Sequence, residues 1–77
     1  MSGWNYRVLR HKTPEETYYQ IHEVYYDENN KPDSWVSSPS APHGTTISEL
    51  RDDIRQMLVA LGKEVLEGKD DKLELAE

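Results

Sequence analysis

The stretch Thr46–Leu61, TISELRDDIRQMLVAL, constrains the fold of this chain more than any other part of it. At about 100° per residue its larger apolar side chains fall within one narrow arc, and charged residues occupy the opposite side. Thr46, with Glu49 three positions later, forms the pattern of a helix capping box, and Gly62 follows the last apolar residue. The stretch predicts one amphipathic helix with a core-facing stripe made of Ile47, Leu50, Ile54, Met57, Leu58 and Leu61.

The first half of the chain must supply the surface on which that stripe packs. Trp4–Arg10 alternates between two faces as a strand does. Thr17–Tyr26 contains three β-branched residues and four tyrosines, and Ser34–Ser37 gives a short third strand. Residues 63–66 fit either a helix extension or a short fourth strand. This order predicts an α+β fold, in which a three-stranded antiparallel meander is followed by one long helix packed on one face (β-β-β-α).

The length of 77 residues fits one domain with one small core. We expect residues 1–66 to form this single α+β domain. From residue 67 the sequence EGKDDKLELAE is rich in charge, so residues 67–77 are expected to be a disordered tail.

The aromatic residues are five tyrosines, two tryptophans and no phenylalanine, so every aromatic side chain carries a polar group. Four of the tyrosines lie in the second strand and are divided between its two faces, whereas one helix can cover only one face. The aromatic residues left uncovered predict a contact surface, although tyrosines in strands also tolerate exposure. The candidate contact residues are Trp4, Tyr18, Tyr26 and Trp35.

The sequence offers little support for catalysis or a bound cofactor. It has no cysteine, its three histidines lack metal-ligand spacing, and its acidic residues lie mostly in turns and on the polar side of the helix. We therefore expect no enzymatic activity, no metal and no cofactor. The alternative is a site for a small ligand on the Tyr/His/Glu-rich second strand, centred on His22 and Glu23.

The charge balance narrows the range of partners. Fifteen acidic residues against nine lysines and arginines give a net charge of −6, which disfavours nucleic acid and anionic lipid. No stretch is apolar enough to span a membrane, and the first ten residues lack the apolar region of a signal peptide. Together with the absence of cysteine, these features predict a cytoplasmic protein.

The segment Gly44–Leu50, GTTISEL, follows three expected strands and opens the helix. In this it resembles the N-terminal domain of HicB-type antitoxins, and that resemblance implies a partial ribonuclease-H-like fold and self-association. The run YYQIHEVYYDENNKP is similar to a widespread family of small bacterial proteins. Two features depart from the HicB pattern. The turn DENNKP replaces an apolar-Pro-Asp-Leu-Pro-Gly-like segment, and no residues remain for a C-terminal DNA-binding module, so autoregulation of transcription is not implied.

These observations favour a non-catalytic module that self-associates as a homodimer or binds a protein partner. The alternative is a domain that binds a small ligand, or a degenerate nuclease-like domain, using the second strand. A third hypothesis is an antitoxin-like inhibitor or a nucleic-acid binder.

Overall fold

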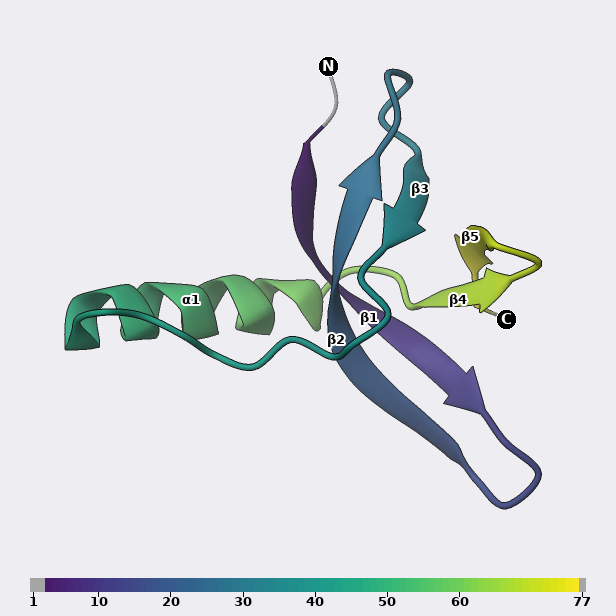
Figure 1. The fold of residues 1–77 in the computed structure, drawn as a ribbon, viewed down its shortest axis with the longest axis horizontal. Helices are drawn as coiled ribbons and strands as arrows, with labels where there is room; N and C mark the ends of the chain where they lie inside the picture. Colours follow the sequence, from purple (N-terminus) through teal and green to yellow (C-terminus); the bar gives the residue numbers. More distant parts are fainter. Residues whose placement is uncertain (1–2, 77) are drawn as a thin grey trace.

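The computed structural model describes residues 3–76, which form a curled five-stranded sheet and one helix that projects from its side (Figure 1). The sheet is mixed, and its strand order is β3-β2-β1-β4-β5. The elements are β1 Trp4–Lys12, β2 Thr17–Tyr26, β3 Pro32–Trp35, α1 Ile47–Ala60, β4 Leu66–Lys69 and β5 Lys72–Leu75.

The first three strands are antiparallel neighbours, and local sequence explains the turn between β2 and β3. The carboxylate of Asp27 accepts hydrogen bonds from the backbone N–H groups of Asn29, at 2.8 Å, and Lys31, at 3.0 Å. Asn30 has a φ of 60°, which its short polar side chain tolerates. This turn therefore directs the chain from the end of β2 into β3.

The segment expected to be a tail forms two strands instead. β4 pairs with β1 in parallel, with Leu66 opposite Leu9, and β5 folds back antiparallel on β4. Asp70 and Asp71, between these strands, have φ angles of 53° and 64°, as in a two-residue type I′ hairpin. The expectation of disorder is thus wrong for residues 67–76, and Glu77 lies outside the described residues.

The expected β-β-β-α fold class is also wrong. The helix is followed by β4 and β5, and the two edge strands β3 and β5 contact each other, so the sheet closes into a nearly barrel-shaped layer. The molecule is consequently β-rich, and its main core lies inside the curl of the sheet. The parallel pairing of β4 with β1 joins segments far apart in the sequence, which strand periodicity alone does not indicate.

The inner core lies on one face of the β1–β2 hairpin. Leu9, Val24 and Leu66 are at most 1% exposed. A Cβ atom added to Gly68 would lie 2.7 Å from the indole of Trp35, so glycine at this position allows β4 to approach that ring closely. The partly buried residues around this core are Tyr26, Trp35 and Leu73.

Local sequence also determines where α1 begins. The hydroxyl of Thr46 accepts a hydrogen bond from the N–H of Glu49 at 3.1 Å, as predicted. The Glu49 carboxylate accepts bonds from the Thr45 hydroxyl, at 2.7 Å, and the Thr45 N–H, at 3.0 Å, and both lower the pKa of Glu49. The reciprocal half of the capping box thus reaches Thr45, one residue before the predicted position.

The packing of α1 differs from the prediction. Met57 is the one residue of the expected stripe that is buried, and Ala60, outside that stripe, is the other buried residue of the helix. Ile47 and Leu58 are 72% and 65% exposed. Figure 1 shows the reason, because the helix leaves the curled sheet and only its C-terminal end lies against the hairpin. The prediction that all six stripe residues face a core is therefore wrong.

Candidate functional site

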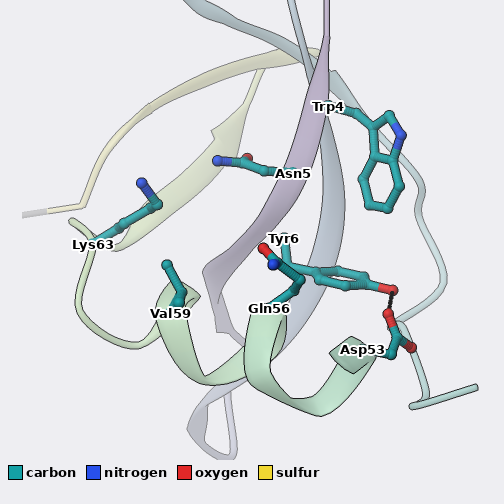
Figure 2. A pocket seen from close by; sticks show the side chains of 7 residues that line it. All are labelled: Trp4, Asn5, Tyr6, Asp53, Gln56, Val59 and Lys63. Atoms are coloured by element: carbon teal, nitrogen blue, oxygen red, sulfur yellow. Dashed lines mark hydrogen bonds between the residues drawn. The ribbon is translucent and has the colours of Figure 1, made fainter. Parts of the chain in front are cut away.

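The C-terminal half of α1 and the beginning of β1 enclose a hollow of about 470 Å³, here named the Trp4 pocket (Figure 2). In Figure 2 the rings of Trp4 and Tyr6 form one side, while Lys63 and Asn5 lie at the other. The two rings meet edge to face with their centroids 5.3 Å apart. The pocket is lined by Trp4, Asn5, Tyr6, Asp53, Gln56, Val59 and Lys63.

A hydrogen-bond network at one side of the pocket ties α1 to β1. The Tyr6 hydroxyl donates to Asp53 Oδ1 at 2.6 Å, and the His43 N–H donates to Asp53 Oδ2 at 2.8 Å. These two bonds lower the pKa of Asp53, the Tyr6 bond more strongly. Burial, followed by the bond to Asp53, raises the pKa of Tyr6 to about 12. Both oxygens of the Asp53 carboxylate are therefore already engaged by the protein.

A second network starts from Arg7, which is only 9% exposed. Its Nη1 donates to the Tyr26 hydroxyl at 2.9 Å, and that hydroxyl donates to Asn5 Oδ1 at 2.7 Å. Its Nη2 donates to the Glu64 carbonyl at 2.8 Å, whereas its buried Nε has no hydrogen-bond partner among the described residues. Arg7 thus orients Asn5 through Tyr26 and holds the backbone next to Lys63 through Glu64.

The two candidate residues of the second strand do not meet. His22 is fully buried on the inner face, where its Nδ1 lies 2.8 Å from the carbonyl of Val36. Glu23 is on the outer face and accepts a hydrogen bond from the Tyr25 hydroxyl at 2.9 Å. The structure therefore brings together no shared ligand site at His22 and Glu23.

His22 is paired instead with His11 on β1, through Nε2 atoms 2.9 Å apart. Because a carbonyl can only accept, Nδ1 of neutral His22 carries the hydrogen, and its Nε2 accepts from His11 Nε2. The His11 ring also stacks on Tyr18, with centroids 5.0 Å apart. Burial, and to a smaller extent His22, lowers the pKa of His11. This pair is a structural contact, and its surroundings favour the neutral form of His11.

The four candidate contact residues are spread over the molecule. Trp4 is 53% exposed at the Trp4 pocket, and Tyr18 is half-buried against His11. Tyr26 and Trp35 pack against the inner core, and Tyr26 uses its hydroxyl in the Arg7 network. The four residues do not form a single aromatic patch.

Exposed apolar side chains are gathered on α1 instead. The helical periodicity of the sequence identified these residues but predicted that they face the core. Next to these side chains, between α1, β2 and the segment before the helix, lies an apolar groove of about 460 Å³. Leu61 belongs to both the helix surface and the groove. The groove is lined by Val8, Tyr19, Gln20, Ile21, Pro39, Ser40, Pro42, Met57 and Leu61.

Neither a metal centre nor a membrane-spanning helix is found in the described part of the chain. Residues 3–76 contain no group of three or more histidine or acidic side chains placed to hold a metal ion. Within the same residues, no helix has the length and apolar character needed to cross a membrane. In comparisons with known proteins, no family model, no curated protein and no solved structure matches this chain.

Proposed function

We propose that this chain is a non-catalytic protein-interaction module that forms a homodimer through α1. The observation that carries the proposal is the uncovered apolar stripe of the helix, here named the α1 stripe and defined as Ile47, Leu50, Ile54, Leu58 and Leu61. Four of these five side chains are between 47% and 72% exposed, and Leu50 is half-buried. Continuous apolar surfaces of this kind mark contact sites in proteins.

The spacing of the α1 stripe favours a second copy of the same chain as the partner. Its residues are placed symmetrically about Ile54, at four and seven positions on either side. In an antiparallel helix pair with a two-fold axis at Ile54, that residue faces its own copy, and Ile47 faces Leu61. The same axis places Leu50 opposite Leu58. A stripe with this symmetry is self-complementary, as an isologous dimer interface requires.

The groove beside α1 extends this contact. Because Leu61 lines the groove, Ile47 of the second copy would lie at its mouth. Covering the four exposed stripe residues contributes on the order of 1 kcal/mol for each side chain, or about 8 kcal/mol for the two copies. Association itself costs about 4–15 kcal/mol, so the stripe alone gives a weak dimer and the groove must add to it. We therefore expect dimerisation that depends on concentration.

The test is the molar mass measured by light scattering after size exclusion, over a range of protein concentrations. We expect the wild-type mass to rise towards twice the 9.0 kDa of one chain. Leu58→Asp places a charge in the stripe and should keep the protein monomeric. Val59→Asp is the matched control, because Val59 is 55% exposed on the same helix but lies outside the stripe. A wild-type protein that is monomeric at every concentration, or equal behaviour of the two variants, would contradict the proposal.

We also propose, from the sequence resemblance, that the chain is related to HicB-type antitoxin domains and acts in the bacterial cytoplasm. The net charge of −6 supports a protein rather than a nucleic acid as any further partner. A ribonuclease that co-purifies with the chain from its native host would support an inhibitory role. If only RNA co-purifies, and its binding weakens steeply with salt, the nucleic-acid alternative is favoured instead.

A further inference from the structure

We infer that the Trp4 pocket binds a small monocarboxylate whose apolar ring contacts Trp4. This inference does not depend on the dimer proposal, because the pocket lies between β1 and a side of α1 that is distinct from the α1 stripe. Its volume of about 470 Å³ is within the range of sites for small molecules.

The acceptors that line the pocket are largely used by the protein itself. Asp53 receives hydrogen bonds on both carboxylate oxygens, and Asn5 Oδ1 accepts from Tyr26. The Tyr6 hydroxyl donates to Asp53 and therefore has no hydrogen left for a ligand. What remains is an excess of donors, because the amide nitrogens of Asn5 and Gln56 and the ammonium of Lys63 stand against the acceptor oxygen of Gln56. A ligand for this site must therefore supply acceptors.

Two of these donors converge at one end of the pocket. Figure 2 shows the amide nitrogen of Asn5 on the side that faces Lys63. The bond from Tyr26 to Asn5 Oδ1 determines this orientation of the amide. Lys63 is exposed and forms no ion pair with any residue between 3 and 76, so its charge is available. An ammonium beside an amide N–H₂ group is suited to a carboxylate.

Arg7 is the positioning residue behind this end of the pocket. It is buried, it holds Asn5 through Tyr26, and it bonds the Glu64 carbonyl that follows Lys63. The Asn5 amide and the backbone that carries Lys63 are therefore held in place before a ligand arrives, while the exposed Lys63 side chain supplies the charge. Such preorganisation reduces the entropy that binding must overcome.

The other end of the pocket is apolar and aromatic. Trp4 is half exposed, and its ring is held edge to face against Tyr6. Val59 of α1 adds an aliphatic surface on the side of Lys63 (Figure 2). Among residues 3–76, the charges that line the pocket are one cation, Lys63, and one anion, Asp53. A single negative charge on the ligand is therefore accommodated, whereas a multiply charged phosphate would be repelled by Asp53 and by the acidic protein as a whole.

The test is a titration followed by ¹H–¹⁵N NMR, with 3-phenylpropionate as the probe. We expect saturable shifts of the Trp4 indole N–H and the Asn5 side-chain N–H₂, while the Trp35 indole N–H stays in place. Neutral 3-phenylpropionamide, propionate and inorganic phosphate should each bind at least tenfold more weakly, because each lacks the ring or the single charge. No saturable shift at Trp4 and Asn5, or equal binding of the neutral amide, would overturn the inference.

Variants separate this site from an unspecific contact. Lys63→Gln removes the cation that the described residues supply to the pocket, and it should weaken binding of 3-phenylpropionate at least tenfold. Lys72→Gln, at an exposed position on β5 outside the pocket, should leave it unchanged. Asn5→Asp keeps an acceptor for Tyr26 but replaces the amide donors with a negative charge, and it should abolish binding. Retention of binding by both Lys63→Gln and Asn5→Asp would contradict the site.

The same titration in the Leu58→Asp variant distinguishes the two proposals. Unchanged binding in that variant is expected, because Leu58 does not line the pocket. Loss of binding on monomerisation would overturn the inference of a site complete within one chain.

Discussion

The β1–β2 hairpin has two faces that carry similar apolar residues but end up in different surroundings. On the inner face, Leu9 and Val24 are sealed by β3 and by the β4–β5 hairpin, and both are at most 1% exposed. On the outer face, Val8 is buried by the end of α1, but Tyr19 stays 58% exposed. The inner face is covered by strands that follow its curvature, whereas a straight helix meets a curved sheet along a short length (Figure 1). Incomplete cover on the outer face leaves both the α1 stripe and the Trp4 pocket accessible.

The largest expected difference between the faces is in core truncation. Leu9→Ala removes a side chain that is 1% exposed, so it should lower the free energy of unfolding by about 2–5 kcal/mol. Leu58→Ala, at 65% exposure, should change it by no more than about 0.5 kcal/mol when measured at concentrations that keep the protein monomeric. Urea unfolding of both variants measures the comparison, and equal losses would show that the two faces are covered alike.

The close approach of β4 to Trp35 should give the next largest effect. In Gly68→Ala the added Cβ would lie 2.7 Å from the indole, so we expect destabilisation by about 1–3 kcal/mol and a shift in Trp35 fluorescence. The control is Gly62→Ala, where the nearest atom would be the Val59 carbonyl oxygen at 3.5 Å. Thermal unfolding of the two variants tests this. If Gly68→Ala is as stable as Gly62→Ala, β4 packs less closely against Trp35 than the structure indicates.

On the outer face, Tyr6→Phe removes the hydrogen bond that joins β1 to Asp53 on α1. We expect a loss of about 1 kcal/mol in the free energy of unfolding, and a rise of the Asp53 pKa towards its ordinary value of 3.8. NMR titration of the Asp53 carboxyl measures the pKa. Tyr25→Phe is the matched control, since it removes an exposed bond to Glu23 and should have almost no effect on stability. Equal effects of the two variants would mean that the Tyr6 bond contributes little to holding the helix.

The smallest expected effect is a pH dependence that again separates the faces. On the inner face, the pKa of His11 is below its ordinary 6.5, so below that pH the unfolded chain binds protons that the folded chain does not. Stability should therefore fall as the pH is lowered from 7 towards 5. The lowered pKa of Asp53 on the outer face acts only at more acidic pH, where stability is lost as that carboxyl is protonated. The free energy of unfolding of the wild type and of His11→Gln, measured at pH 7 and at pH 5, isolates the contribution of His11. An equal change between the two pH values in both proteins would contradict this role of His11.

Much of the local structure of this chain was predictable because it depends on neighbouring residues. The alternation in β1 and β2, the Asn30 turn and the Thr46 cap all follow from side chains within a few positions. A signal for the β4–β5 hairpin was also present, in the alternating residues around Asp70 and Asp71, but the charge of the segment led to the prediction of a tail. In the Trp4 pocket, the sequence pointed only to Trp4, as an uncovered aromatic residue.

The sequence by itself determined β1, β2, the turn that follows β2 and the extent of the helix, because hydrogen bonding and periodicity are local. Only the tertiary structure decided that β4 pairs with β1, and that Met57 and Ala60 rather than the centre of the stripe face the sheet. These choices depend on the curvature of the whole sheet, which no window of sequence contains. The link from Arg7 to Asn5 and Glu64 is likewise a product of the fold, because it joins groups as many as 57 positions apart.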